Sequence, residues 1–124
     1  MDEAQEIAQR WIKRWSTADG IKTSEAVADD SWIELPVKNP ELCYGVILNA
    51  LKSVPADPAN PVLQNIAAGP LEDLLSAHGS TLIERIEIEA RRNPAFNLLL
   101  GGVWQNTMSS EVWSRIQAAR LKVW

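Results

Sequence analysis

The residues of this chain that are best suited to chemistry lie close together, just past the middle of the sequence. They are the only histidine and its neighbouring carboxylates: Glu72, Asp73, His78, Glu84 and Glu87. Two carboxylates and an imidazole at short spacing could exchange protons with a substrate or bind a metal ion. This stretch is therefore the first place to look for a catalytic or ligand-binding site.

A structural interpretation accounts for the same residues more simply. Gly69-Pro70 predicts the start of a helix, and Gly79 fits the left-handed position that ends one. Glu72 and Asp73 then fall in the first turn, where carboxylates bind free amides and favour the helix dipole. His78 falls in the last turn, where its ring can donate to free carbonyls. We predict helix-capping roles, no catalytic residues and no metal site.

Motifs of the common enzyme and cofactor sites do not occur in the chain. It has no glycine-rich phosphate loop, no Gly-x-Ser-x-Gly elbow and no His-Glu-x-x-His motif. One histidine without histidine or cysteine neighbours supplies too few ligands for a zinc site. We therefore predict no cofactor. An enzyme or small-ligand binder that uses Glu72, Asp73 and His78 is kept as an alternative hypothesis.

Composition and charge restrict the class of partner. The net charge is −4 and the isoelectric point is about 5.0, which argues against nucleic acid, because phosphates are bound by clustered Lys and Arg. An acidic chain is better matched to a basic protein partner. Cys43 is the only cysteine, so no intramolecular disulfide can form.

The ends and the apolar runs of the chain carry no targeting signal. The N-terminal residues lack the basic and apolar regions of a signal peptide. No apolar run approaches the ~20 residues that cross a bilayer. We expect a cytoplasmic protein with no membrane partner.

Three Asn-Pro pairs mark where helices begin: Asn39-Pro40, Asn60-Pro61 and Asn93-Pro94. The side chain of an N-terminal capping Asn accepts a hydrogen bond from an otherwise unpaired amide. Proline at the next position loses nothing, because its missing N–H has no partner there. Each pair is followed by apolar residues at helical spacing, so three helix starts are predicted.

The remaining elements follow from apolar spacing and from the turn residues between them. We predict helices over 3–17, 24–34 (capped by Ser24 and closed by Pro36), 40–53, 61–68 (ended by Gly69), 70–78, 81–92, from Pro94 to Gly101-Gly102, and from Ser109 or Ser110 onward. In the last helix, an apolar stripe is expected at Val112, Ile116, Ala119 and Val123.

No stretch alternates apolar and polar residues over strand length. The predicted fold is all-α, a compact array of seven to eight short helices in a single domain over residues 1–124. Stacked antiparallel helix pairs are one arrangement that such short connections allow. At this length the chain can bury about two thirds of its unfolded surface.

Several of these landmarks together resemble a family of small bacterial proteins of unknown function, DUF6869. They are Asn39-Pro40-Glu41-Leu42, the segment 67–75 with His78-Gly79, Ile86-Glu87 with Glu89-Ala90-Arg91, Val103-Trp104 and Val112-Trp113. Residues 19–38 depart most from the family pattern. The resemblance implies a bacterial, helical, single-domain protein, and it assigns no catalytic residues.

The favoured functional hypothesis is a protein-binding module of the immunity or inhibitor kind. Its contact residues are expected on the polar faces beside the central helix: Glu72, Asp73, His78, Glu84, Glu87 and Arg91. Tryptophans at 11, 15, 32, 104, 113 and 124 are expected mostly in the core, with one or two left for a partner. The third hypothesis is a self-associating structural protein with Trp113 and Trp124 exposed. Both a monomer and a homodimer fit the sequence.

Overall fold

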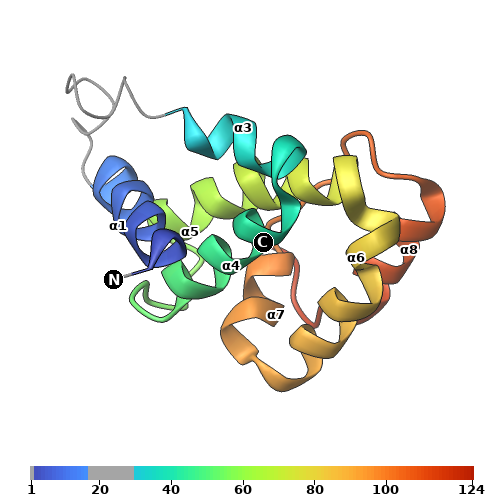
Figure 1. Cartoon of the computed structure of the whole chain (residues 1–124). Helices are drawn as coiled ribbons and strands as arrows, with labels where there is room; N and C mark the ends of the chain where they lie inside the picture. Colours follow the sequence, from blue (N-terminus) through green and yellow to red (C-terminus); the bar gives the residue numbers. More distant parts are fainter. Residues whose placement is uncertain (1, 17–29) are drawn as a thin grey trace.

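The computed structural model describes residues 2–16 and 30–124, and all regular structure in that part of the chain is helical (Figure 1). The elements are α1 (Glu3–Ser16), α3 (Ser31–Lys38), α4 (Pro40–Leu51), α5 (Pro61–Ile66), the π-helical turn η2 (Ala67–Leu71), α6 (Glu72–Arg92), α7 (Pro94–Leu100) and α8 (Ser110–Ala119). The predicted all-α fold is confirmed. Since α5, η2 and α6 follow without a break, the described residues form six continuous helical segments, fewer than the seven to eight expected.

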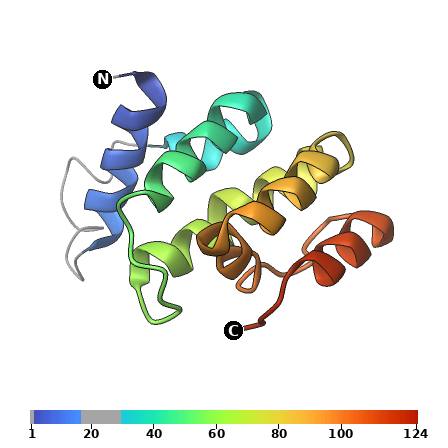
Figure 2. The same ribbon diagram turned by 90° about the horizontal axis from the view of Figure 1, so that it is seen from below.

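The continuous segment α5–η2–α6 runs through the middle of the molecule (Figure 2). On one side α1 packs against α4 and α5, and on the other α8 packs against α6. The short helix α3 lies over η2 and α6. No helix among the described residues is both long and apolar enough to cross a membrane.

The three predicted Asn-Pro helix starts are confirmed. Asn39 accepts from the amide of Leu42 at 3.3 Å, and Asn93 accepts from that of Phe96 at 3.2 Å. Asn60 accepts from two amides, those of Val62 and Leu63, at 2.9 and 3.3 Å. In each case, proline follows at the first helical position, where it needs no N–H.

The last helix start is confirmed as well. Ser109 caps α8 by accepting from the amide of Val112 at 3.2 Å. These caps depend only on residues adjacent in sequence, which is why the sequence locates them.

The predicted break at Gly69-Pro70 is wrong. Instead of ending one helix and starting another, these residues lie inside η2, and the chain continues directly into α6. In an α-helix, the ring of Pro70 would clash with the carbonyl four residues earlier. The wider π-helical turn accommodates that ring, so the helix passes through proline without stopping.

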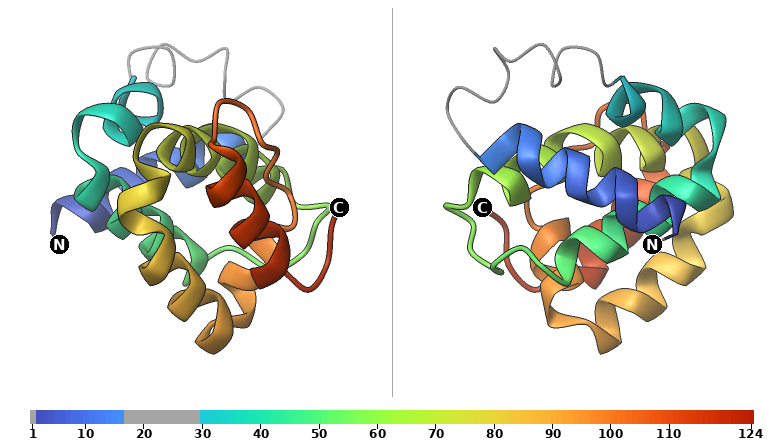
Figure 3. Two further views of the ribbon diagram at one scale, coloured as in Figure 1. Left: turned by 90° about the vertical axis from the view of Figure 1, so that its right-hand side faces the viewer. Right: turned by 60° about the vertical axis from the view of Figure 1, so that its left-hand side comes forward.

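The predicted stop at His78-Gly79 is present as a kink, not as a helix end. His78 has φ −133° and ψ 17°, and α6 changes direction there (Figure 3). Gly79 does not have the positive φ that we expected of it. Its missing side chain serves packing, because a Cβ atom there would lie 2.8 Å from Cγ1 of Val112 in α8.

The helix predicted over 24–34 overlaps the region outside the described residues, and its expected cap, Ser24, lies in that region. The described structure begins a helix at Ser31 and carries it through Pro36 to Lys38, so the prediction that Pro36 closes the helix is wrong. Pro36 is buried inside the helix, where it lacks the N–H that would bond to the carbonyl four residues earlier. The amide of Asn39 still reaches the carbonyl of Leu35 at 2.9 Å.

The core is built from the apolar faces that the helical spacing predicts. Its largest fully buried side chains are Trp11, Ile47, Leu63, Ile66, Leu71, Leu74, Leu75, Leu82, Ile86, Phe96, Leu99 and Leu100. Burying each contributes roughly 1.5–3 kcal/mol. Trp11 also donates from Nε1 to Oγ of Ser31 at 2.9 Å, which ties α1 to α3.

The C-terminal segment departs from the predicted stripe. α8 ends at Ala119, and Val123 lies beyond it and is exposed. Trp124 turns back onto α7, where its Nε1 donates to the carbonyl of Leu98 at 2.6 Å. The indole ring lies against Gly102, where a Cβ atom would come within 2.5 Å of it. Trp124 is therefore held by the fold and is not a free hydrophobic surface.

Trp113 is likewise half-buried, with the guanidinium of Arg120 stacked 4.9 Å from its ring centroid. The exposed tryptophan is Trp104, at 70% of its surface. The expectation of an exposed Trp113–Trp124 patch is therefore wrong, because both rings have intramolecular contacts.

Candidate functional site

Two of the three predicted site residues on the N-terminal part of α6, Glu72 and His78, contact the backbone of other segments. A carboxylate oxygen of Glu72 accepts from the amide of Trp104 at 3.2 Å, and Nε2 of His78 is 2.8 Å from the carbonyl oxygen of Val37. Burial raises the pKa of Glu72 despite the hydrogen bond from Trp104, and burial raises the pKa of Asp73. Glu72 therefore ties α6 to the loop before α8, and His78 ties it to α3.

These contacts do not gather a reactive set. Glu72 and His78 interact with different segments of the chain, and no group of three His, Cys, Asp or Glu side chains within residues 2–16 and 30–124 could hold a metal ion. Cys43 is buried, which raises the pKa of its thiol to about 12, so it is a neutral core residue at pH 7.

The other three predicted site residues, Glu84, Glu87 and Arg91, lie beyond the kink. Arg115 of α8 donates to both carboxylate oxygens of Glu87, at 3.0 and 2.5 Å. That ion pair lowers the pKa of Glu87, to which Arg91 also contributes. Glu84 is exposed and close enough to Arg115 to interact with its charge. The predicted set is thus divided between two parts of α6.

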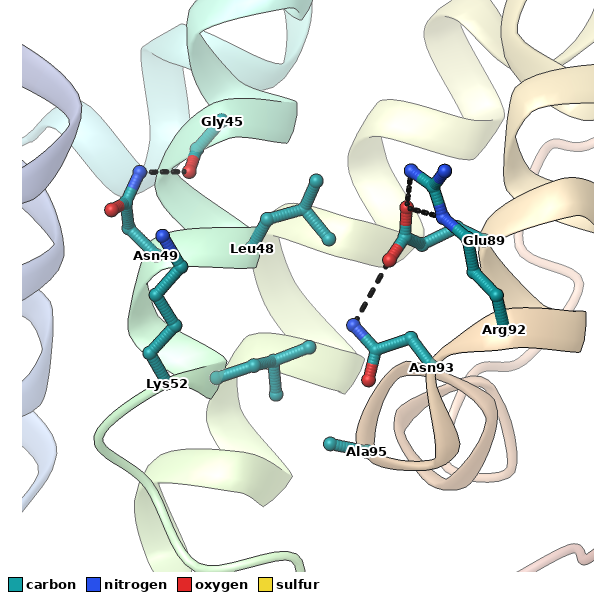
Figure 4. Close-up of a pocket in the computed structure, with 9 residues that line it drawn as sticks. Gly45, Leu48, Asn49, Lys52, Glu89, Arg92, Asn93 and Ala95 are labelled. Carbon is teal, nitrogen blue, oxygen red and sulfur yellow. Dashed lines mark hydrogen bonds and ion pairs between the residues drawn. The ribbon is translucent and has the colours of Figure 1, made fainter.

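A concave feature of the described residues lies elsewhere, between α4 and the C-terminal part of α6. Two adjoining pockets of about 490 and 320 Å³ have four lining residues in common: Gly45, Leu48, Glu89 and Arg92. Figure 4 shows the larger pocket, with α4 on one side and α6 and the start of α7 on the other. We call the two pockets together the α4–α6 groove.

Helical periodicity explains how α4 and α6 line this groove. The α4 residues include Glu41, Tyr44, Leu48 and Lys52, spaced three or four apart on one face. From Glu41 to Lys52 the helix rises about 16 Å at 1.5 Å per residue. The groove therefore follows nearly the whole length of α4.

A buried ionic network forms the α6 wall of the groove. Glu89 is only 7% exposed, and its Oε1 accepts from Nε and Nη2 of Arg92 at 3.2 and 2.8 Å. Its Oε2 accepts from Nδ2 of Asn93 at 3.0 Å. Burial alone would raise the pKa of Glu89, but the hydrogen bonds from Asn93 and Arg92 outweigh it, so the pKa is lowered. The carboxylate is thus held ionised at pH 7.

A second ion pair closes the other end of the groove. Nη1 of Arg85 is 2.7 Å from Oε1 of Glu41, and the guanidinium lies 5.1 Å from the ring centroid of Tyr44. The Tyr44 ring in turn packs edge-on against Phe96 in the core. Burial and the nearby Glu89 charge raise the pKa of Tyr44 to about 12, so its phenol is neutral at pH 7.

The charge of the groove differs from that of the chain. Its lining holds three cations, Lys52, Arg85 and Arg92, against two anions, Glu41 and Glu89, which leaves one positive charge in a chain of net −4. Lys52 is exposed and forms no ion pair within the part of the chain that the structure describes. Leu48 is half-buried in the groove and Ile88 is 48% exposed beside it.

Sequence reasoning missed the groove because its existence depends on how α4 and α6 pack. One local signal was available. Arg85, Ile88 and Arg92 follow an i, i+3, i+7 pattern on α6, which places an exposed isoleucine between two arginines. A single exposed apolar residue is common on protein surfaces, so this pattern becomes informative only once the groove beside it is known.

An all-α fold with an open groove between two of its helices defines the structural class of this protein. The chain belongs to a family of unknown function, DUF6869, which matches residues 15–123. The predicted resemblance is confirmed over nearly the whole chain. No curated protein and no solved structure matches it.

Proposed function

We propose that this protein is a protein-binding module, acting as an inhibitor or immunity-like partner of another protein through the α4–α6 groove. The observation that carries the proposal is an open groove, lined along α4 from Glu41 to Lys52, with apolar side chains beside ion pairs. Helix-lined grooves of this kind receive amphipathic segments of partner proteins. A small-molecule site would be expected to enclose most of its ligand, whereas this groove is open to solvent.

The side chains of the groove supply the two components of a binding interface. Leu48 and Ile88 offer apolar surface that a partner can bury. Arg85 and Arg92 are already oriented by carboxylates, so a partner that meets them loses less side-chain entropy on binding. Arginine is enriched at the energetic centres of protein interfaces.

The basic partner expected from the net charge would use a different surface. Glu84 and Glu87 lie on α6 beside α8, away from the lining of the groove. Because Glu87 is held by Arg115, reversing its charge would also break a contact between helices. The variant Glu84→Lys tests this acidic surface with less structural disturbance.

Affinity purification from the native host tests the proposal with matched variants. Ile88→Glu places a charge on the groove, and Ile33→Glu does so on α3, where the side chain is equally exposed, at 49% against 48%. We expect a stoichiometric protein partner with the wild type and with Ile33→Glu, and its loss with Ile88→Glu. Equal recovery of the partner with both variants would show that the groove is not the binding surface. Recovery of no partner with the wild type would contradict the proposed binding function.

Two further measurements extend the same experiment. Loss of the partner with Glu84→Lys, together with dissociation in high salt, would assign the contact to the acidic surface and a basic partner. The proposal also includes a cytoplasmic location in a bacterial cell, which fractionation of the native host would test. Sedimentation of the purified protein would distinguish the monomer from the homodimer.

A further inference from the structure

The charges and the shape of the α4–α6 groove specify its occupant more closely. We infer that the groove receives a short amphipathic helix of a partner protein, with an apolar face and acidic residues along its edge. This inference rests on the proposed binding function. It reverses the expectation from net charge, because the lining of the groove carries one net positive charge in a chain of net −4.

The length of the groove sets the length of the helix. A span of about 16 Å corresponds to about 11 helical residues, or three turns. Apolar side chains at i, i+3 or i+4, and i+7 of such a helix would lie in one row. Leu48 on α4 and Ile88 on α6 are placed on opposite sides of the groove to contact that row.

The charge expected of the occupant's edge residues follows from which hydrogen-bonding groups of the groove already have partners within the protein. The Glu89 carboxylate is buried and accepts three hydrogen bonds, two from Arg92 and one from Asn93, so it has little capacity left for a partner. Arg92 uses Nε and Nη2 for Glu89, while its Nη1 donates to nothing in the described part of the chain. Its side chain is 71% exposed.

Lys52 supplies the second cation at the same end of the groove, on the opposite wall (Figure 4). Carboxylates on the occupant could meet the free donors of Lys52 and of Arg92. A lysine or arginine beside either residue would face a like charge. The groove therefore selects acidic over basic segments of equal apolar content.

Selection from a displayed library tests the inference without a natural partner. Fifteen-residue peptides with randomised positions are selected on the immobilised wild-type protein, after removal of those that also bind Ile88→Glu. We expect the selected sequences to have apolar residues at i, i+3 or i+4, and i+7, with Asp and Glu outnumbering Lys and Arg. An excess of basic residues, the lack of helical spacing, or no peptide that discriminates against Ile88→Glu would overturn the inference.

Affinity measurements on one selected peptide test the cationic contact directly. Lys52→Glu should weaken binding about fivefold, the effect of reversing one charge at the edge of an interface. Lys122→Glu is the matched control, because it makes the same charge change on an exposed lysine outside the groove, and it should leave the affinity unchanged. Equal effects of the two variants would show a general charge effect and overturn the assigned contact.

The other candidate occupant is a second copy of this chain. Concentration-dependent self-association that is lost in Ile88→Glu but kept in Ile33→Glu would assign the groove to a homodimer and overturn the inference. Failure of the peptide selection is distinguishable from failure of the proposed function, since the purification experiment can still return a partner that uses another surface.

Discussion

The two parts of α6, before and after the kink at His78, use their polar side chains differently. Before the kink, Glu72 and His78 contact backbone groups of neighbouring segments, and burial raises the pKa of Glu72. After it, Glu87 and Glu89 are paired with arginines and their pKa values are lowered. The first part of α6 thus binds the loop before α8 and helix α3, and its second part forms a charged surface.

This difference shows why clustering in sequence is a poor guide to a site. Glu72, Asp73 and His78 are close along the chain, but Glu72 and His78 contact separate segments that they help to position. Arg85, Ile88 and Arg92 received no role in the sequence analysis, yet they line a groove with residues of α4. The two parts meet beside Gly79, where α6 packs closely against Val112 of α8, so a change at Gly79 should have the largest effect.

Gly79→Ala should destabilise the protein by about 2 kcal/mol. On helix propensity alone alanine would stabilise by about 1 kcal/mol, but its Cβ would lie 2.8 Å from Cγ1 of Val112 and force α8 away. Urea unfolding of the single and double variants measures the effect. In a Val112→Ala background the same change should be neutral or stabilising, and a stabilising effect in the wild type would contradict the packing role.

Glu89→Gln should cost about 1–2 kcal/mol at pH 7, because charge-assisted hydrogen bonds from Arg92 and Asn93 are replaced by weaker ones. The lowered pKa means that ionised Glu89 stabilises the fold above its ordinary value of 4.5, and that this stabilisation is lost as the pH falls through the folded-state pKa. Unfolding free energies of both proteins should therefore converge in acid. A difference that is constant with pH would argue against a charged Glu89.

Glu72→Gln should change the free energy of unfolding in the opposite direction to Glu89→Gln and stabilise the protein at pH 7. The gain should be less than about 1 kcal/mol, since partial exposure screens the charge. The raised pKa means that ionisation of Glu72 disfavours the fold, and the glutamine oxygen can still accept from the amide of Trp104. The advantage of the variant should shrink as the pH falls from 7 toward 4.5. If this variant destabilises as much as Glu89→Gln, the two parts of α6 do not differ as described.

Glu84→Lys should change the free energy of unfolding by less than about 0.5 kcal/mol, because Glu84 is exposed and its charge interaction with Arg115 is screened by solvent. Thermal unfolding at low and high salt measures it. A larger loss that disappears in high salt would show that Glu84 belongs to the ionic network between α6 and α8.

The sequence predicts those features of the fold that depend on neighbouring residues. The caps at Asn39, Asn60 and Asn93 are local interactions, and all are present. The apolar faces of α4 and α7 are likewise local periodic patterns, and they are buried as expected. Whether a proline stops a helix is not predicted by such local patterns: Pro70 lies in a π-helical turn, and Pro36 lies inside α3, which continues to Lys38.

The candidate site could not be predicted, because it depends on separations between helices that no local pattern encodes. Gly79 appeared to be a helix stop until the proximity of Val112 showed that it permits close packing. Glu89 was assigned no burial or role from the sequence, and it is the packing of α4 against α6 and α7 that buries it. Both features arise where two distant segments meet.

The amide of Asn93 has a consequence for which sequences this fold can accept. Its oxygen accepts from the amide of Phe96 at the start of α7, and its nitrogen donates to Glu89 in the groove. Aspartate could supply the first contact but would repel Glu89, and serine is too short to reproduce the geometry of both. The side chains at positions 89 and 93 are therefore energetically coupled, so the effect of replacing one depends on the residue present at the other. A lineage that replaces the asparagine would be expected to give up the buried acid as well, and with it the orientation of Arg92 toward whatever binds there.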